Sequence, residues 1–342
     1  MSEHTPYIEL HTHSYYSLLD GVPSPEDLVE QAAALSMPAL ALTDHNALYG
    51  AAHFWKAATR VGIKPIFGTE ITLNNGDEHL TLLAENDKGY ANLCRLITLA
   101  QSNCEKGTAA LPWHMMANHS DGIIAMSGCR NSGIARAILD RHIDKAKKLT
   151  AQSVDIFGKN NFFLELQRHH RRGDRSLNEG LTTIGHDLKL PLVATGNVHY
   201  LKPHDASLHD VLTCIRHRTR LDRASGLLRR NAEYYFRTPE EMQSLFANWP
   251  AALHSTQQIA ERCSVQLPLG PQTLPTYPTP SGISTEEHLS NLCQAKLIHK
   301  YNSSTSEKYR NTLQLELDII AEHKLGNYFL IVWDLVSFAR EQ

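Results

Sequence analysis

The sequence predicts an α/β protein: a mostly parallel sheet, closed as a barrel or open, followed by a smaller helical region. From residue 6 to about 215, short apolar segments alternate with amphipathic ones, and repeated strand–helix units favour parallel strands covered by helices. After about residue 205 the apolar residues follow helical spacing. Seven strand-sized segments in roughly 210 residues suit a barrel.

The expected strands are short apolar runs, with helices between most of them. The strands are Tyr7–Leu10, Ala39–Leu42, Pro65–Phe67, His79–Leu83, Gly122–Met126, Phe162–Leu166 and Leu192–Ala194. Ser24 precedes Pro25 and two acidic residues, which predicts a capped helix start. Further helices are expected at Ala47–Val61, Lys88–Ser102, Ser176–Leu188 and Leu208–Arg216.

These patterns divide the chain into three expected parts. Residues 1–215 form the barrel, 216–283 a helical extension with a proline-rich linker, and 284–342 a further helical region. Thr238-Pro239-Glu240-Glu241 predicts a capped helix in the second part. The chain stops at Gln342 within an amphipathic pattern, which predicts a natural chain that continues further.

Composition excludes several protein classes and favours one kind of chemistry. The net charge of −3 gives no global basic field, so any nucleic-acid contact must use local patches. The 6 cysteines form no CxxC pair and fit a reducing compartment. No signal peptide or membrane-length apolar run is visible, so a cytoplasmic protein without a membrane partner is expected. The 20 histidines draw attention to metal or acid–base chemistry.

Ligand-type side chains collect at the ends of the expected strands. In chain order these are His11, His13 and Asp20; Asp44 and His45; Glu70; His79; Cys129; and Asn197 and His199. In a parallel barrel, the strand ends at one face converge on one cavity. His11 and His13, two residues apart on a strand, point to the same side. Ligand-type residues at five strand ends predict a multinuclear metal site.

The mixture of donor atoms indicates which metals to expect. Imidazole, carboxylate and thiolate together favour Zn, Mn or Fe ions over Mg²⁺ or Ca²⁺, which prefer oxygen alone. We therefore expect two or three divalent transition-metal ions in each chain.

Several motifs resemble those of the PHP (polymerase and histidinol phosphatase) domain. They are Leu10-His11-Thr12-His13-Ser14, Ser17-Leu18-Leu19-Asp20-Gly21, Leu42-Thr43-Asp44-His45, Gly68-Thr69-Glu70, Ser127-Gly128-Cys129 and Asn197-Val198-His199-Tyr200. Their order and spacing extend through about 200 residues. The resemblance implies a distorted (β/α)7 barrel that holds up to three metal ions.

The resemblance also implies a ligand set for each ion. The first ion would take His11, His13, Glu70 and Asn197; the second Glu70, His79 and Cys129; the third Asp20, His45 and His199. Glu70 would then bridge two ions. Most active members have Asp where this chain has Asn197, and a neutral amide oxygen is a weaker ligand than a carboxylate.

The later part of the chain narrows the resemblance. Its motifs are Thr238-Pro239-Glu240-Glu241-Met242, Ile259-Ala260-Glu261-Arg262-Cys263 and Asn327-Tyr328-Phe329-Leu330-Ile331-Val332-Trp333-Asp334. These motifs are similar to the segment that joins the PHP domain to the polymerase core in bacterial DNA polymerase III alpha subunits. The histidine-rich motifs of the first part resemble those of the error-prone polymerases more than those of the replicative alpha subunits. The resemblance implies that 284–342 begins the polymerase core, whose catalytic aspartates would lie beyond residue 342.

The favoured interpretation is metal-dependent phosphodiester hydrolysis, with a DNA 3′ end as substrate and a proofreading-type 3′–5′ exonuclease as the activity. His13, His45 or His199 would protonate the leaving oxygen, and Arg130, beside Cys129, would clamp a phosphate. The expected partners are DNA, the rest of the polymerase chain, and other replication or repair subunits.

Two alternatives stay open: a metal-stabilised scaffold without turnover, which Asn197 favours, and a small-molecule phosphatase. Two arginine-rich runs, at 168–175 and 216–230, are either solvated surface or contacts for a phosphate backbone.

Overall fold

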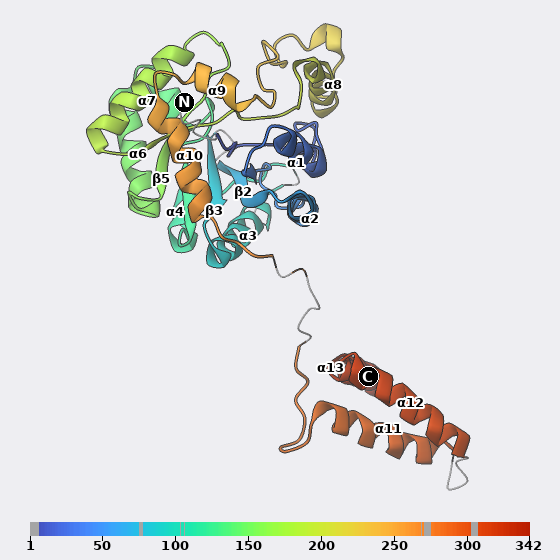
Figure 1. Cartoon of the computed structure of the whole chain (residues 1–342). Helices are drawn as coiled ribbons and strands as arrows, with labels where there is room; N and C mark the ends of the chain where they lie inside the picture. The colour runs from blue at the N-terminus through green and yellow to red at the C-terminus, as the bar shows by residue number, and fades with distance from the viewer. Residues whose placement is uncertain are drawn as a thin grey trace. The chain divides into compact units, whose positions relative to one another are not determined.

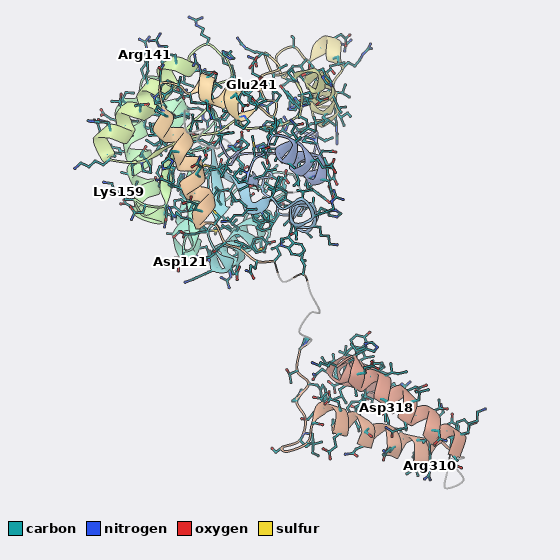
Figure 2. The ribbon with its side chains drawn as sticks, in the orientation of Figure 1. Asp121, Arg141, Lys159, Glu241, Arg310 and Asp318 are labelled. Carbon is teal, nitrogen blue, oxygen red and sulfur yellow. The ribbon has the colours of Figure 1, made fainter. Side chains whose placement is uncertain are left out.

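The computed structural model describes residues 7–74, 78–102, 104–105, 107–267, 269, 275–301 and 307–342. The chain separates into two compact units, Met1–Leu267 and Pro268–Gln342, which are described individually below. Figure 1 colours them from blue to orange and from orange to red along the chain. In both units, charged side chains such as Asp121, Lys159 and Asp318 point outward to solvent (Figure 2).

The first unit is built on one six-stranded sheet whose strands lie in chain order. The strands are β1 (Ala39–Leu42), β2 (Lys64–Leu73), β3 (Glu78–Ala84), β4 (Ile123–Met126), β5 (Phe162–Leu166) and β6 (Leu192–Ala194). Every residue of β1, β4 and β5 is buried, as expected for strands covered on both faces. The expected α/β class is confirmed.

An extended segment at the start of the chain closes the sheet into a distorted barrel. Residues 7–10, expected as a strand, are not assigned as one, because the segment makes only scattered ladder hydrogen bonds. On one side the carbonyl of Glu9 accepts from the amide of Ala41 at 3.0 Å. On the other, the carbonyl of His11 accepts from the amide of Val198 at 2.9 Å. The segment therefore joins β1 to the chain that follows β6.

One strand runs against the others. β3 pairs antiparallel with both β2 and β4, whereas the β1–β2, β4–β5 and β5–β6 pairs are parallel. β2 also extends beyond its expected end at Phe67, so Glu70 lies inside the strand opposite Thr81. Because β3 is reversed, its first residues lie at the edge where the parallel strands end. This places His79 next to Glu70.

Helices surround the strands (Figure 1). They include α1 (Pro25–Ala34), α2 (Ala51–Val61), α3 (Asp87–Ser102), α4 (Trp113–Met116), α5 (Gly133–Leu139), α6 (Ile143–Phe157) and α7 (Asp174–Leu188). α2 packs on β2, α3 on β3 and α7 on β5. In one such contact Phe54 meets Phe67 edge to face with their ring centroids 6.0 Å apart, a favoured aromatic geometry.

The predicted start of α1 is confirmed. Ser24 accepts from the amide of Asp27 at 2.9 Å, and the Asp27 carboxylate accepts from the amide of Ser24 at 3.0 Å. Replacing a capping serine by alanine costs about 1 kcal/mol in typical helices. Leu28, Val29 and Ala32 then form the buried face.

The helices after residue 205 belong to the same compact unit as the barrel. They are α8 (Ala206–Arg216), α9 (Pro239–Leu245) and α10 (Pro250–Arg262), and α9 has the predicted capping box of Thr238 and Glu241. α10 packs on β6, and Ile259 is fully buried in a cluster with Ile8 and Leu10. The unit thus extends to Leu267, beyond the boundary that we expected at residue 215.

The second unit has three helices in its described part: α11 (Thr285–Tyr301), α12 (Glu307–Glu322) and α13 (Gly326–Glu341). Leu289, Leu317 and Leu330 form their small core. Part of the expected proline-rich linker, at 268 and 270–274, lies outside the described residues. In the described part of the chain, no helix is both long and apolar enough to cross a membrane.

Candidate metal centre

Four imidazoles surround the carboxylate of Glu70, and we call these five residues the Glu70 centre. Nε2 of His11 lies 2.7 Å and Nε2 of His13 3.7 Å from Oε2 of Glu70. Nδ1 of His79 lies 2.5 Å and Nδ1 of His45 3.4 Å from the other oxygen, Oε1. One carboxylate is therefore shared by two pairs of imidazoles that come from three different segments.

Backbone pairing places these side chains. His11 and His13 lie on the extended segment that closes the barrel, and the amide of His13 donates to the carbonyl of Val198 at 2.8 Å. The backbone of His45 forms a bridge with that of Glu70 just beyond the end of β1. Asp44 links the residues around His45 to Ser14, because its carboxylate accepts from the amide and the hydroxyl of Ser14 at 2.7 and 2.8 Å.

A second carboxylate contacts the ring nitrogen of His11 that does not face Glu70. Oε1 of Glu165, on β5, lies 2.6 Å from Nδ1 of His11, and Glu165 is 2% exposed. Gln167 and Thr195 also donate to this carboxylate. The contact fixes the ring so that Nε2 faces Glu70, as carboxylate partners of metal-ligating histidines do. Glu165 was not among the predicted site residues, although a charged residue inside the apolar run Phe162–Leu166 was a visible signal.

A second group, which we call the Asp20 cluster, consists of Asp20, His199 and His209. Nδ1 of His199 and Nε2 of His209 lie 3.4 and 3.3 Å from the Asp20 carboxylate. His45 links this cluster to the Glu70 centre, because its Nε2 lies 2.8 Å from Oδ2 of Asp20. His209, on α8, was not predicted. In the sequence it is one histidine on an amphipathic helix, with no motif around it.

The remaining expected site residues lie close by. Oδ1 of Asn197 is 3.0 Å from Nε2 of His199. The backbone φ of Asn197 is 48°, a value that asparagine tolerates better than most residues. Cys129 is buried beside His79. The guanidinium of Arg130 donates to Asp174 and to the carbonyl of Arg172, both at 2.9 Å.

The buried charges are strongly coupled. Burial alone would raise the pKa of the Glu70 carboxyl, but His45 and His79 hold it well below its usual range. Asp20 has a lowered pKa for the same reason, since His199, His209 and His45 outweigh its burial. Burial opposes the protonation of His79, yet Glu70 and Cys129 raise its pKa to about 11. Burial and the neighbouring His45 lower the pKa of His13.

The donor set fits divalent cations. Three groups have ligand atoms within 4.8 Å of one another: His11, His13 and Glu70; His45, Glu70 and His79; and Asp20, His199 and His209. Three buried nitrogens, Nε2 of His13, Nδ1 of His79 and Nδ1 of His199, make no well-aligned hydrogen bond in the described part of the chain, although Nδ1 of His79 lies 2.5 Å from Glu70 and Nδ1 of His199 lies 3.4 Å from Asp20. Buried polar atoms are normally paired, so such nitrogens beside carboxylates suit metal ligation.

The site opens into a cleft of about 970 Å³. Its walls include every expected ligand except the buried His11 and His13, together with Arg130. Three arginines from the two basic runs, Arg171, Arg216 and Arg229, also line it. The structure thus brings all nine expected ligands and Arg130 to one place, and it adds residues that the motifs did not include.

Comparisons with known proteins agree with this geometry. Residues 9–169 match the PHP domain family, and residues 287–342 match the family described as "Bacterial DNA polymerase III alpha NTPase domain". A solved structure from Bifidobacterium adolescentis, described as a metal-dependent phosphoesterase, has 18% sequence identity and a TM-score of 0.42 over 57% of this chain and 88% of its own. A likeness at that level adds nothing further to the argument.

Curated relatives align with nearly the whole chain. An error-prone DNA polymerase of Symbiobacterium thermophilum is 39% identical over 98% of this chain and 32% of its own length. DNA polymerase III alpha subunits of Treponema pallidum and Borreliella burgdorferi are 33% and 35% identical, over 98% and 100% of this chain and 30% and 31% of their own. The chain thus spans about a third of the length of these relatives. The chain thus contains a PHP domain and is homologous over nearly its whole length to bacterial DNA polymerase III alpha subunits and error-prone DNA polymerases.

Proposed function

We propose that the barrel is a metal-dependent phosphodiesterase that removes nucleotides from a DNA 3′ end. The observation that carries the proposal is the sharing of Glu70 between two imidazole groups at the base of the arginine-lined cleft. A carboxylate shared by two groups can bridge two ions, and paired ions suit the displacement of an oxygen at phosphorus. A site for a single structural ion would need no shared carboxylate and no open cleft.

The chain's own residues define where ions would bind. His11, His13 and Glu70, with Asn197 nearby, would hold one ion; Glu70, His79 and Cys129, with His45 adjacent, would hold a second. Bound divalent ions, which we expect to be Zn, Mn or Fe, supply Lewis-acid chemistry by activating water and offsetting charge on phosphoryl oxygens. Glu165 would keep His11 in the required orientation, because it accepts the proton on Nδ1.

We assign the proton-donor role to His45 among the three histidines considered. The His45 side chain is 25% exposed, whereas those of His13 and His199 are 0% and 3% exposed. His13 is stacked between the other two, with ring centroids 4.3 Å from His45 and 4.4 Å from His199. Nε2 of His45 faces Asp20 at 2.8 Å and Nδ1 faces Glu70 at 3.4 Å, so the Nε2 proton would pass to a leaving oxygen in the cleft only when the ring turns away from Asp20.

DNA is the substrate that the cleft walls favour. Arg130 stays fixed by Asp174 and would direct its remaining N–H groups at a phosphate, while Arg171 and Arg216 extend the positive surface. The exposed ring of Tyr49 at the cleft offers a face on which a base can stack. The overall acidic charge does not oppose this, since backbone contact requires only a local patch.

In a chain as long as those of the relatives, the second unit would form the start of the polymerase core and contact the rest of it. Its helix α13 exposes apolar side chains such as Leu335 and Phe338, at 64% and 63%, and exposed apolar surface of this kind marks contact with other protein. We also propose a cytoplasmic location, with replication or repair subunits as further partners.

The test uses the purified chain, reconstituted with Zn²⁺ or Mn²⁺, and a single-stranded DNA labelled at its 5′ end. Stepwise shortening from the 3′ end that chelation abolishes, and that Glu70→Gln lacks, is the expected result. A phosphomonoester assayed in parallel separates this activity from a small-molecule phosphatase. Metal-loaded chain that leaves the DNA intact would contradict the proposal.

A metal-stabilised scaffold is the second candidate, and Asn197 favours it. The amide contacts His199 and Gln167 where a carboxylate would strengthen ion binding. For a scaffold, metal loading would raise the melting temperature, and the DNA and the phosphomonoester would both remain uncleaved.

A further inference from the structure

An arginine occupies the Asp20 cluster from a loop outside the barrel motifs. Arg229 follows α8 in the chain, and its Nη2 lies 2.8 Å from Nε2 of His199. Its Nε donates to Nε2 of His209 at 3.2 Å, and Nη2 lies 3.8 Å from Oδ1 of Asp20. The guanidinium therefore contacts all three members of the cluster.

Packing against an aromatic ring holds the guanidinium in this position. Its central carbon lies 3.9 Å from the ring centroid of Tyr234, a cation–π geometry. Tyr234 is itself buried and stacks on His169, with centroids 3.9 Å apart and the planes at 11°. The Arg229 side chain is 22% exposed, so it is held against this stack rather than extended into solvent.

The chemistry of imidazole makes this contact incompatible with metal ligation by His199. A guanidinium has only donors, and a neutral imidazole has one N–H and one lone pair. When Nε2 of His199 accepts from Arg229, Nδ1 must carry the proton, and Nδ1 faces the Asp20 carboxylate at 3.4 Å. Neither nitrogen then has a lone pair for an ion. If Nδ1 instead bound an ion, Nε2 would carry the proton and could donate to Oδ1 of Asn197 at 3.0 Å, but the guanidinium, 2.8 Å from the same nitrogen, would then face a second donor.

We infer that Arg229 is the resident cation of the Asp20 cluster, and that it and a third divalent ion exclude one another there. The Glu70 centre differs, because no arginine or lysine pairs with Glu70 among the described residues. The chain therefore takes two ions at the Glu70 centre, while a guanidinium compensates Asp20. The inference rests on the proposed function in one respect only, because it takes two bound ions as the content of the wild type.

The experiment compares metal content after saturation with Zn²⁺ and removal of the excess, for the whole chain and three variants. Arg229→Ala frees His199 and His209, and it should bind about one ion more per chain than the wild type. Arg229→Met keeps an apolar contact with Tyr234 and should show the same gain if the alanine variant folds poorly. Melting temperature confirms that each variant is folded.

Arg216→Ala is the matched control. Arg216 lies 3.5 Å from the same oxygen of Asp20, but it makes no contact with either imidazole among the described residues. It should therefore gain no ion. An equal gain in Arg216→Ala would show that net charge, not the lone pair of His199, decides occupancy, and would overturn the inference. So would a wild type that binds three ions, or an Arg229→Met variant that gains none.

The number of ions that the wild type binds tests the proposed function separately. A wild type that holds about no ions would contradict the metal-dependent function, and the difference between the wild type and the Arg229 variants would still decide the role of Arg229.

Discussion

The Glu70 centre and the Asp20 cluster use the same side-chain types but leave them in opposite states. At Glu70, one carboxylate faces four imidazoles, and Nε2 of His13 makes no hydrogen bond in the described chain. At Asp20, a guanidinium already contacts the carboxylate and both imidazoles of the cluster. A guanidinium thus pairs with the carboxylate of the second site, whereas no arginine or lysine pairs with Glu70 among the described residues.

The difference teaches that ligand-type residues alone do not define an ion site. What decides is whether the lone pairs that a metal needs are still available.

Glu70→Ala should be the most damaging single change at either site. Its loss removes the carboxylate that lies between the His11–His13 and His45–His79 pairs, so both ions of the Glu70 centre should leave together. We expect metal affinity to fall more than about 100-fold, since even outer partners of ligands contribute about 10–100-fold. Metal content and melting temperature measure this, beside His79→Ala, His199→Ala and the exposed-site control Glu179→Ala. If Glu70→Ala loses no more metal than the histidine variants, Glu70 is not a bridge.

Glu165→Gln should weaken the Glu70 centre without touching the Asp20 cluster. The amide keeps the shape of the side chain but loses the charge that fixes the proton on Nδ1 of His11. Metal affinity should fall about 10–100-fold. Titration with a chromophoric chelator measures it, and added Zn²⁺ should restore full occupancy at high concentration. An unchanged affinity would mean that Glu165 serves folding alone.

The metal-free chain should lose stability in alkaline solution because of His79. Its pKa in the folded chain is raised from 6.5 to about 11. The stabilisation is complete below about pH 6.5, and it is lost between there and about pH 11, where the unfolded chain has released the proton that the folded chain keeps. Melting of chelator-treated protein from pH 6 to 10 measures a loss of at least about 1 kcal/mol. His79→Gln should flatten this slope, and an equal slope in both proteins would contradict the assignment.

Asn197→Asp should have the smallest effect, and in the opposite direction. If residue 197 is a ligand of the first ion, as the resemblance implies, a carboxylate there would strengthen the binding of that ion by up to about tenfold, or about 1.4 kcal/mol. Metal affinity and the rate of phosphodiester hydrolysis should rise together. Asn197→Ser offers an uncharged comparison. Equal affinities for the wild type and the aspartate variant would mean that residue 197 does not contact the ion.

Much of the fold was predictable because the strands are apolar runs and the helix starts have strong caps. The ends of α1 and α9 followed from Ser24 and Thr238. The reversal of β3 was missed, although the short interval between Phe67 and His79 leaves little room for the crossover that parallel strands need.

The candidate site, like the fold, was predictable only in part. Residues in motifs at strand ends, such as His11 and Glu70, were found because strand ends converge. His209 and Arg229 were missed because each reaches the site through tertiary packing alone, whereas Glu165 had a signal, its charge inside an apolar strand. Local sequence does not reveal that kind of contact.

The reversed strand also has a consequence for the order in which the site forms. Because β3 returns directly beside β2, Glu70 and His79 meet across a loop of only a few residues, whereas Glu165 must travel from another part of the chain to reach His11. Short loops close in well under a microsecond and at little entropic cost, while distant contacts wait for the chain to collapse. The β2–β3 hairpin can therefore present a carboxylate and an imidazole to an ion before the barrel has closed. An ion captured at that stage would act as a nucleus for folding, and refolding in the presence of Zn²⁺ would be faster than refolding in its absence.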